Sequence, residues 1–162
     1  SKDAFLFCCY AGLRYSDFIN LTAANIVELH QETWLIYKSV KTGIDVRLPL
    51  YLLFEGKGLR VLETYKDDLN GFFKLKDNSN VNKDLNALAK LAEIDKRISF
   101  HTARHTNATL LIYSGANITT VQKLLGHKSV KTTQVYANIM DMTIVHDLEK
   151  AAYSKLANRP KS

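Results

Sequence analysis

The chain has 162 residues, enough for one domain with a sizeable hydrophobic core. No apolar run approaches the ~20 residues that a membrane-spanning helix needs, and the opening Ser1-Lys2-Asp3 has neither a start methionine nor a secretory pattern, so we expect a non-membrane segment cut from inside a longer protein. The 22 basic and 16 acidic residues give a net charge of +6, which suits a polyanionic partner without requiring one.

The chain begins with an apolar segment that predicts a buried helix. This helix covers residues 3–9 and is broken at Gly12, after which Ser16 is the expected N-cap of a short second helix. The adjacent Cys8 and Cys9 would point in different directions on the first helix, which disfavours a disulfide between them. We expect both to be buried free thiols in a reducing cytoplasm.

A small antiparallel sheet is predicted next. Residues 26–29, 34–37 and 46–48 are rich in β-branched and aromatic side chains and favour three short strands. Residues 41–45 form the turn between the second strand and the third, and Pro49 ends the sheet.

Helical spacing of apolar residues dominates the rest of the chain. It predicts helices around residues 59–65 and 85–92, separated by a polar loop at 70–80. Ser99 is a candidate N-cap for the helix that follows. Four later helices are expected, at 101–114, 119–125, 130–139 and 142–156. The expected fold is therefore mostly α, with a small three-stranded antiparallel sheet.

The densest group of reactive side chains lies in the last third of the chain. His101 and Arg104 are three residues apart and would share one face of a helix. Arginine matches phosphate oxygens with a planar fork of donors, and histidine exchanges protons near neutral pH. An isolated His-x-x-Arg is usually a surface pair, so this motif depends on its neighbours. His101 and His105 have a spacing that zinc ligands use, but a third ligand is missing. A structural His105, packed in the core or hydrogen-bonded to backbone, is favoured over a metal site.

Those neighbours are found in residues 124–137, LLGHKSVKTTQVYA. His127 and Tyr136 would lie on opposite sides of one continuous helix, but Gly126 and Ser129 indicate a break that would turn Tyr136 toward His127. A tyrosine has a reference pKa of ~10 and needs cationic or hydrogen-bonding neighbours to act as a nucleophile. Taken alone, Tyr136 would be interpreted as a packing residue.

HTARH followed by LLGHKSVKTTQVYA resembles the signature of tyrosine recombinases and phage-type integrases, which is His-x-x-Arg, then Leu-Leu-Gly-His, then Thr-Thr-x-x-Tyr. Residues 11–17, AGLRYSD, are similar to the first arginine motif of that family, and residues 40–43, VKTG, to its β-hairpin lysine. The GLRYSD wording also resembles integrases of Bacteroides-type mobile elements. The similarity extends over residues 5–139. It implies that residues 1–162 form the C-terminal catalytic domain, without the N-terminal core-binding domain that the family usually carries.

The resemblance also implies an activity, the cleavage and rejoining of DNA strands through a 3′-phosphotyrosyl intermediate. Tyr136 is implied to be the nucleophile, while Arg14 and Arg104 bind the non-bridging oxygens of the scissile phosphate. Lys41 is the implied general acid that protonates the leaving 5′-hydroxyl. His101 is implied to assist proton transfer, including as a base toward the tyrosine.

The remaining implied site residues support the phosphate and its ligands. His127 is expected to donate a hydrogen bond to the phosphate, and Asp17 to hold Arg14 in place. The lysines nearest the signature are candidate contacts to DNA phosphates: Lys123, Lys128 and Lys131.

The resemblance fixes expectations about cofactors and partners. Two guanidinium groups and two imidazoles can supply the charge stabilisation that a metal supplies elsewhere, so neither metal nor other cofactor is expected. The expected partner is double-stranded DNA at a specific recombination site, in the bacterial cytoplasm at the nucleoid. We expect the full-length protein to form a homo-tetramer on DNA and this domain alone to be a monomer. The final helix, residues 141–156, either passes to a neighbouring subunit or folds back onto its own domain.

Two other functions remain open at this stage. One is a type IB topoisomerase-like enzyme, which uses similar chemistry without strand exchange and is disfavoured by the LLGH and Thr-Thr pattern. The other is a catalytically inactive DNA-binding relic. The complete set of implied catalytic residues argues against it.

Overall fold

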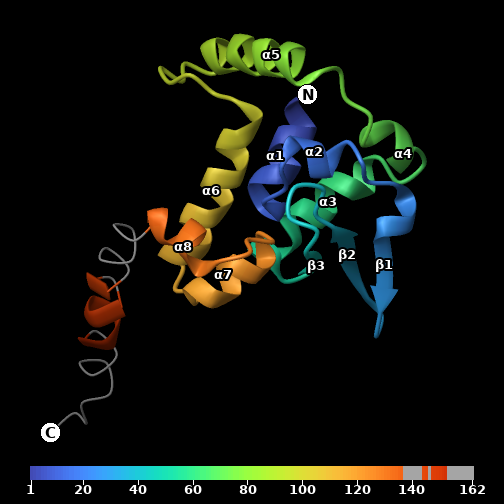
Figure 1. Ribbon diagram of the computed structural model, residues 1–162. Coiled ribbons are helices and arrows are strands. Elements are labelled where there is room, and N and C mark those ends of the chain that lie inside the picture. The colour runs from blue at the N-terminus through green and yellow to red at the C-terminus, as the bar shows by residue number, and fades with distance from the viewer. Residues whose placement is uncertain (137–143, 146, 153–162) are drawn as a thin grey trace, which may run out of the picture.

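The computed structural model describes residues 1–136, 144–145 and 147–152 (Figure 1). The helices and strands labelled in Figure 1 are α1 (Lys2–Ala11), α2 (Tyr15–Phe18), β1 (Ile26–Leu29), β2 (Glu32–Lys38), β3 (Asp45–Pro49), α3 (Lys57–Thr64), α4 (Leu69–Phe72), α5 (Asn78–Leu91), α6 (Phe100–Tyr113), α7 (Ile118–Leu124) and α8 (Val130–Thr133). Short 3-10 helices span Ala23–Asn25, Leu53–Gly56 and Gln134–Tyr136. The prediction of a mostly α fold with a small sheet is confirmed. In the described part of the chain, no helix is long and apolar enough to cross a membrane.

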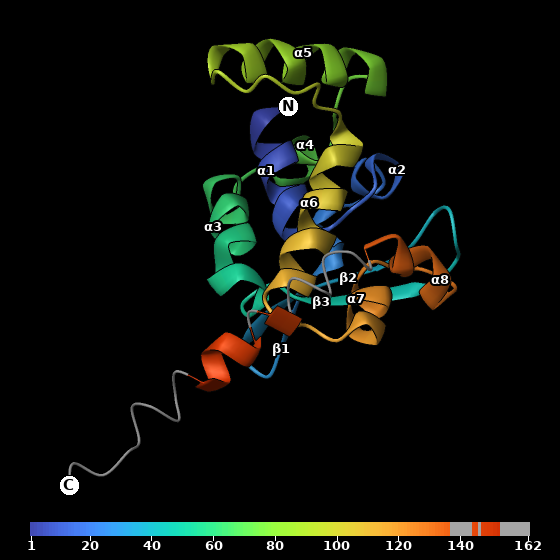
Figure 2. The same cartoon turned by 90° about the vertical axis from the view of Figure 1, so that its left-hand side faces the viewer.

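Helix α1 is the centre of the domain. Figure 2 shows it between α3 and α6, and α1 makes its most extensive helix contacts with these two helices. Phe7 and Cys8 are completely buried on it, and Cys8 and the buried Cys9 are free thiols, as predicted. The helix ends where Gly12, at φ 71°, donates its backbone N–H to the carbonyl of Cys8 at 2.8 Å. This confirms the break predicted at Gly12.

A cluster of phenylalanines joins helices α1, α2, α4 and α6. Phe18 of α2 lies at its centre, with ring centroids 5.3 to 6.2 Å from the four other rings, in edge-to-face geometry that favours aromatic pairs. These rings belong to Phe7, Phe72, Phe73 and Phe100. The cluster fixes the start of α6 relative to α2, and both elements carry predicted site residues.

The sheet has the strand order β1-β2-β3 with antiparallel neighbours. Leu35 of β2 pairs with Leu48 of β3, and both side chains are completely buried, which sets the register that directs this face to the core. Pro49 is the last residue of β3, as predicted. The turn before β3 contains Gly43 at φ 69°, a conformation that glycine adopts at low cost.

Of two predicted helix N-caps, one was wrong and one was correct. Helix α2 begins at Tyr15 with Arg14 at its N-cap, so Ser16 lies inside the helix. The expected N-cap serine at the start of α6 is correct, because the backbone N–H of Ser99 donates to Thr102 Oγ1 at 3.0 Å in a capping box.

The polar loop predicted at residues 70–80 was wrong at both ends, because only residues 73–77 of that segment lie outside helices. Helix α4 occupies its beginning and α5 starts at Asn78. Each helix has an aspartate N-cap: Asp68 accepts from the backbone N–H of Gly71 at 2.9 Å, and Asp77 from that of Asn80 at 3.1 Å. Polar composition concealed these caps, because capping residues and loop residues are of the same types.

The C-terminal helices are only partly described. The helix expected at 130–139 is α8 followed by a 3-10 turn up to Tyr136, and its remainder lies outside the described residues. Of the helix expected at 142–156, residues 144–145 and 147–152 are helical, and the rest lies outside the described residues. Ile144, Val145 and Leu148 are exposed, so these side chains do not fold back onto their own domain.

Candidate active site

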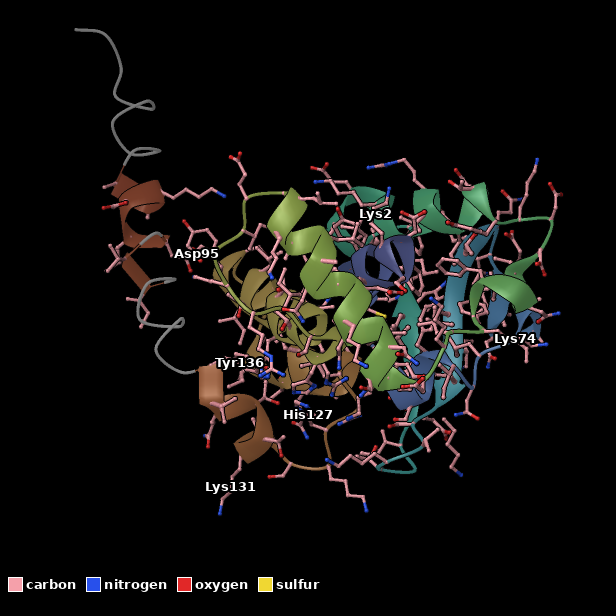
Figure 3. The ribbon with its side chains drawn as sticks, turned by 90° about the horizontal axis from the view of Figure 1, so that it is seen from above. Lys2, Lys74, Asp95, His127, Lys131 and Tyr136 are labelled. Carbon is pink, nitrogen blue, oxygen red and sulfur yellow. The ribbon has the colours of Figure 1, made fainter. Side chains whose placement is uncertain are left out.

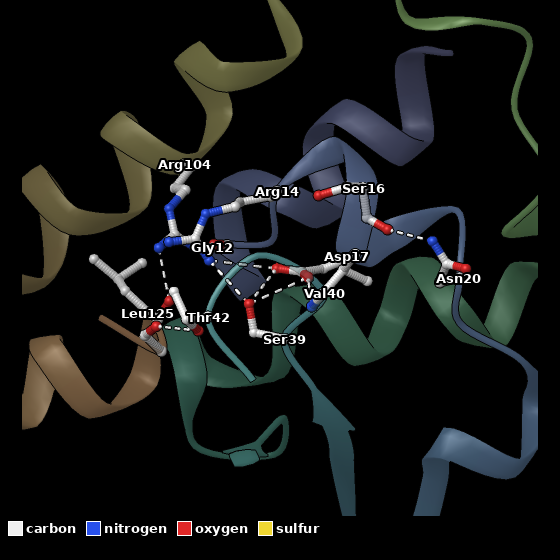
Figure 4. Close-up of polar contacts among 11 residues, drawn as sticks. Gly12, Arg14, Ser16, Asp17, Asn20, Ser39, Val40, Thr42, Arg104 and Leu125 are labelled. Carbon is white, nitrogen blue, oxygen red and sulfur yellow. Dashed lines mark hydrogen bonds and ion pairs between the residues drawn. The ribbon is translucent and has the colours of Figure 1, made fainter. Parts of the chain in front are cut away.

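Segments from both halves of the chain meet beside the first turns of α6 (Figure 4). They are the junction of α1 and α2, the turn between β2 and β3, and the loop that follows α7. The aromatic cluster and the register of the sheet bring these segments together, so distant positions in the sequence contribute to one site.

Arg104 projects from α6 into the centre of this site and is 2% exposed. Its Nη1 donates to the carbonyl of Gly12 at 2.7 Å, and its Nη2 donates to the carbonyl of Leu125 at 2.6 Å. Burial lowers the pKa of Arg104 to about 10, with a smaller lowering from the charge of Arg14, so the group stays cationic near neutral pH. Both acceptors are neutral, which leaves the positive charge uncompensated by them.

Asp17 joins Arg14 to the turn that carries Lys41. Its carboxylate lies 3.5 Å from Nη1 of Arg14 and accepts the backbone N–H of Val40 at 2.8 Å. Ser39 links the two groups, since its hydroxyl lies 3.3 Å from Asp17 Oδ1 and accepts from Arg14 Nη1 at 3.2 Å (Figure 4). Asp17 is 1% exposed and Arg14 is half-buried. The predicted contact between Asp17 and Arg14 is present.

Lys41 is exposed at the tip of the same turn. The neighbouring Thr42 donates its hydroxyl to the carbonyl of Gly126 at 3.0 Å, which ties the turn to the end of α7. Burial lowers the pKa of His101, and nearby cations that include Lys41 lower it further. The charge of Lys41 therefore acts on the same region as the arginines.

His127 follows Gly126, whose φ of 62° ends α7 and turns the chain toward α8. Its Nδ1 is hydrogen-bonded to Thr133 Oγ1 at 2.9 Å, and the ring is 8% exposed. Burial lowers the pKa of His127 to about 4, with further lowering from Arg104 and Arg14, so the ring is neutral at neutral pH. Ser129 caps α8 by accepting from the backbone N–H of Lys131, which confirms the predicted break.

Tyr136 is hydrogen-bonded to a different histidine from the one predicted. Its hydroxyl lies 2.6 Å from Nδ1 of His105, and the two rings are 5.7 Å apart, whereas His127 is paired with Thr133. Tyr136 is 8% exposed, and burial raises the pKa of its hydroxyl, partly offset by the charge of Arg104. Figure 3 shows Tyr136 and His127 on the same side of the molecule, with Lys131 projecting outward.

The structural role in the core or on the backbone that was expected of His105 is wrong. His105 is exposed, and its hydrogen bond goes to a side chain. Its ring also lies edge-on against that of His101, with centroids 4.4 Å apart. Within the described residues, no group of three or more His, Cys, Asp or Glu side chains is placed to hold a metal ion.

Three side chains that order the site were not predicted as site residues: Ser39, His105 and Thr133. Ser39 and Thr133 are buried polar residues, a property that is invisible without the fold. A signal for His105 was available, because residues four apart on a helix share a face. The three lysines next to the signature, Lys123, Lys128 and Lys131, are exposed.

Comparison with known proteins identifies the family. Residues 1–142 match the model of the phage integrase family. The chain belongs to this family. It is 34% identical over 147 residues to a tyrosine recombinase of Thermosipho africanus, covering 86% of this chain and 50% of that protein. It is 31% identical over 156 residues to the tyrosine recombinase XerA of Pyrococcus horikoshii, covering 87% of this chain and 51% of that protein. This integrase-family chain thus spans about half the length of these curated relatives.

Solved structures of the family share the fold. A crystal structure of XerA recombinase superposes with a TM-score of 0.67 at 24% identity, covering 99% of this chain and 63% of that one. A lambda integrase dimer bound to a COC′ core site superposes with a TM-score of 0.68 at 20% identity, covering 83% of this chain and 50% of that one. The integrase-family chain therefore has the fold expected from its sequence motifs.

Proposed function

We propose that this chain is the catalytic domain of a longer site-specific DNA recombinase. In this proposal Tyr136 attacks the scissile phosphodiester, forms a 3′-phosphotyrosyl bond and releases a 5′-hydroxyl. Rejoining is the reverse reaction with a new 5′-hydroxyl, so it consumes no ATP. The placement of the chain among integrases of Bacteroides-type mobile elements stays a prediction.

The observation that carries the proposal is the buried charge of Arg104, which donates to two neutral carbonyls and forms no ion pair among the described residues. Two backbone carbonyls orient its guanidinium, and Arg14 raises the local positive charge. A phosphate would supply the missing negative charge and accept from two guanidinium groups. Fixed cations at the position where charge develops stabilise a phosphoryl-transfer transition state without a reorganisation cost. The phenol of Tyr136 lies within the influence of the same charge.

The other residues have complementary roles in this proposal. Lys41, exposed on the turn held by Asp17, protonates the leaving 5′-oxygen. His101 assists proton transfer, and neutral His127 donates a hydrogen bond to the phosphate. The bond between His127 Nδ1 and Thr133 leaves Nε2 to act as that donor, provided that Nε2 carries the ring proton.

Covalent trapping on DNA tests this function. The full-length protein first selects a duplex from a random-sequence library, and the selected duplex is then nicked at successive positions to trap the adduct. Reactions in EDTA are resolved on a denaturing gel. We expect a shifted protein–DNA band with wild type and with Tyr51→Phe, and none with Tyr136→Phe. A bound duplex that never forms an adduct would instead indicate a DNA-binding relic.

Replacement of either arginine tests the phosphate site. Removing one donor of an oxyanion site typically costs ~2.7–4 kcal/mol, so Arg14→Ala and Arg104→Ala should each slow adduct formation at least ~100-fold. Near-wild-type cleavage by either variant would contradict the assignment. A strand-exchange assay with two duplexes then separates a recombinase from a topoisomerase-like enzyme, which relaxes DNA without exchanging partners.

We also propose that the exposed lysines contact DNA phosphates: Lys123, Lys128 and Lys131. Replacing one with alanine should weaken binding on all sequences and reduce the slope of log affinity against log salt by about 1. An unchanged slope would remove that lysine from the interface.

The assembly and location follow from the same function. We propose that the full-length protein acts as a homo-tetramer on DNA in the bacterial cytoplasm, at the nucleoid, and that this domain alone is monomeric. Sedimentation of the domain, and of the full-length protein with its duplex, measures both states. Exposed Ile144, Val145 and Leu148 are candidates for contacts between subunits.

A further inference from the structure

We propose that His105 accepts the phenolic proton of Tyr136 when the tyrosine attacks DNA. This inference rests on the proposed function and assigns the base to His105, where the sequence had suggested His101. In the step, the phenolic oxygen forms a bond to phosphorus while the bond from phosphorus to the 5′-oxygen breaks. The phenolic proton moves to His105 Nδ1, and the leaving oxygen takes a proton from Lys41.

The geometry favours His105 as the base over His127 and Asp17. Its Nδ1 lies 2.6 Å from the Tyr136 hydroxyl, within the range in which a general base receives a proton. With the ring proton on Nε2, Nδ1 is an acceptor and the phenol is the donor. His127 uses its Nδ1 on Thr133, and the carboxylate of Asp17 is engaged by Arg14 and Val40.

The environment of the tyrosine makes a proton acceptor necessary. Burial raises the pKa of Tyr136, so the phenolate is scarce at neutral pH and proton removal must accompany attack. Arg104 favours the anion but is held by two carbonyls and cannot take a proton. His105 is exposed, so the proton that it receives can exchange with water or return to Tyr136 during rejoining.

The groups around His105 come from α6 and from the 3-10 turn that follows α8. His101 shares its face of α6, Arg104 precedes it in the same helix, and Tyr136 approaches from the 3-10 turn after α8. Protonation of His105 would place a cation beside His101 and Arg104, but the phosphotyrosyl diester formed at Tyr136 would bring compensating negative charge. The protonated state would therefore be most favourable after attack.

A test without DNA examines the hydrogen bond itself. Long-range proton–nitrogen NMR of the 15N-histidine-labelled full-length protein reports the tautomer and hydrogen bonding of each ring nitrogen. We expect His105 to carry its proton on Nε2, with an Nδ1 resonance that shifts in Tyr136→Phe. An Nδ1-protonated His105, or a resonance unmoved by Tyr136→Phe, would overturn the proposal.

A kinetic test examines proton transfer. Asparagine can place a polar atom near the position of Nδ1 but is not a base, so His105→Asn should slow adduct formation about 100-fold without weakening DNA binding. His30→Asn is the matched control, because His30 is exposed in the β1–β2 turn at φ 52°, which asparagine tolerates. Millimolar imidazole should restore His105→Ala at least tenfold, a rescue that a purely structural role would not give.

The outcomes separate this inference from the proposed function. Wild-type rates in His105→Asn and His105→Ala would show that another group is the base, while the recombinase chemistry stands. Faster adduct formation in His105→Ala would show that His105 restrains the tyrosine, and would also overturn the proposal. Absence of an adduct from wild type on the selected, nicked duplex would instead defeat the proposed function.

Discussion

Asp17 and Val40 are far apart in the sequence, yet Asp17 Oδ1 accepts the backbone N–H of Val40 at 2.8 Å. The same carboxylate lies 3.5 Å from the guanidinium of Arg14. One buried side chain therefore fixes both an arginine of the site and the turn that carries Lys41. This arrangement couples the positions of the phosphate ligand and the proposed general acid.

Asp17→Asn tests this coupling. The amide keeps a hydrogen-bond acceptor but removes the charge opposite Arg14, so we expect the free energy of unfolding to fall by about 1–3 kcal/mol. Adduct formation should slow by more than the loss of folded protein explains, because Arg14 and Lys41 both lose their support. Urea denaturation and single-turnover cleavage measure the two effects. A variant with wild-type stability and rate would show that the backbone alone holds the turn.

Gly12→Ala should be strongly destabilising. A Cβ there would lie 2.6 Å from Asn107 Oδ1 and 2.8 Å from Leu125 Cδ2, and the residue has φ 71°. Overpacking costs typically 1–3 kcal/mol, and the left-handed conformation adds roughly 1 kcal/mol. Gly115→Ala is the control, because Gly115 has φ 91° but no atom within 4 Å of its Cβ position. If urea denaturation shows equal losses of unfolding free energy in Gly12→Ala and Gly115→Ala, the close packing at Gly12 relaxes freely.

Thr133→Val should affect His127 more than the overall fold. Valine has nearly the shape of threonine but leaves Nδ1 of His127 without its partner, which costs about 1–3 kcal/mol for a buried polar group. We expect slower cleavage in Thr133→Val and recovery in Thr133→Ser, which restores the hydroxyl. If the Thr133→Val and Thr133→Ser variants cleave equally fast, the orientation of His127 does not depend on this hydrogen bond.

His127 should make stability fall in mild acid. Its pKa is about 4 in the folded chain and ~6.5 when unfolded, so the unfolded state binds the proton first as pH falls. Its contribution is complete above pH ~6.5 and is lost progressively down to pH ~4. We expect the free energy of unfolding to fall by about 1–2 kcal/mol over this pH interval. The His127→Gln variant should lose this pH dependence, and the His30→Gln variant should keep it. The measurement is urea denaturation at a series of pH values, and a His127→Gln slope equal to wild type would contradict the assignment.

Much of the fold was predictable because local patterns agree with it. The alternation at Leu35 and the glycine at the end of α1 each have a local cause. The loop prediction before α5 failed because Asp77, typical of loops, caps a helix instead. Within the site, the HxxR and LLGH motifs identified Arg104 and His127. The partner of Tyr136 depends on how the turn after α8 packs on α6, which no local pattern encodes.

The two carbonyls that hold Arg104 have a consequence for synthesis. One belongs to Gly12, near the start of the chain, and the other to Leu125, near the end of the described domain. Because translation proceeds from the N-terminus, a nascent polypeptide that has not yet released Leu125 from the ribosome lacks half of the cradle for this guanidinium. The proposed DNA-cutting centre is therefore assembled only after Leu125 has been made, late in the synthesis of the described domain.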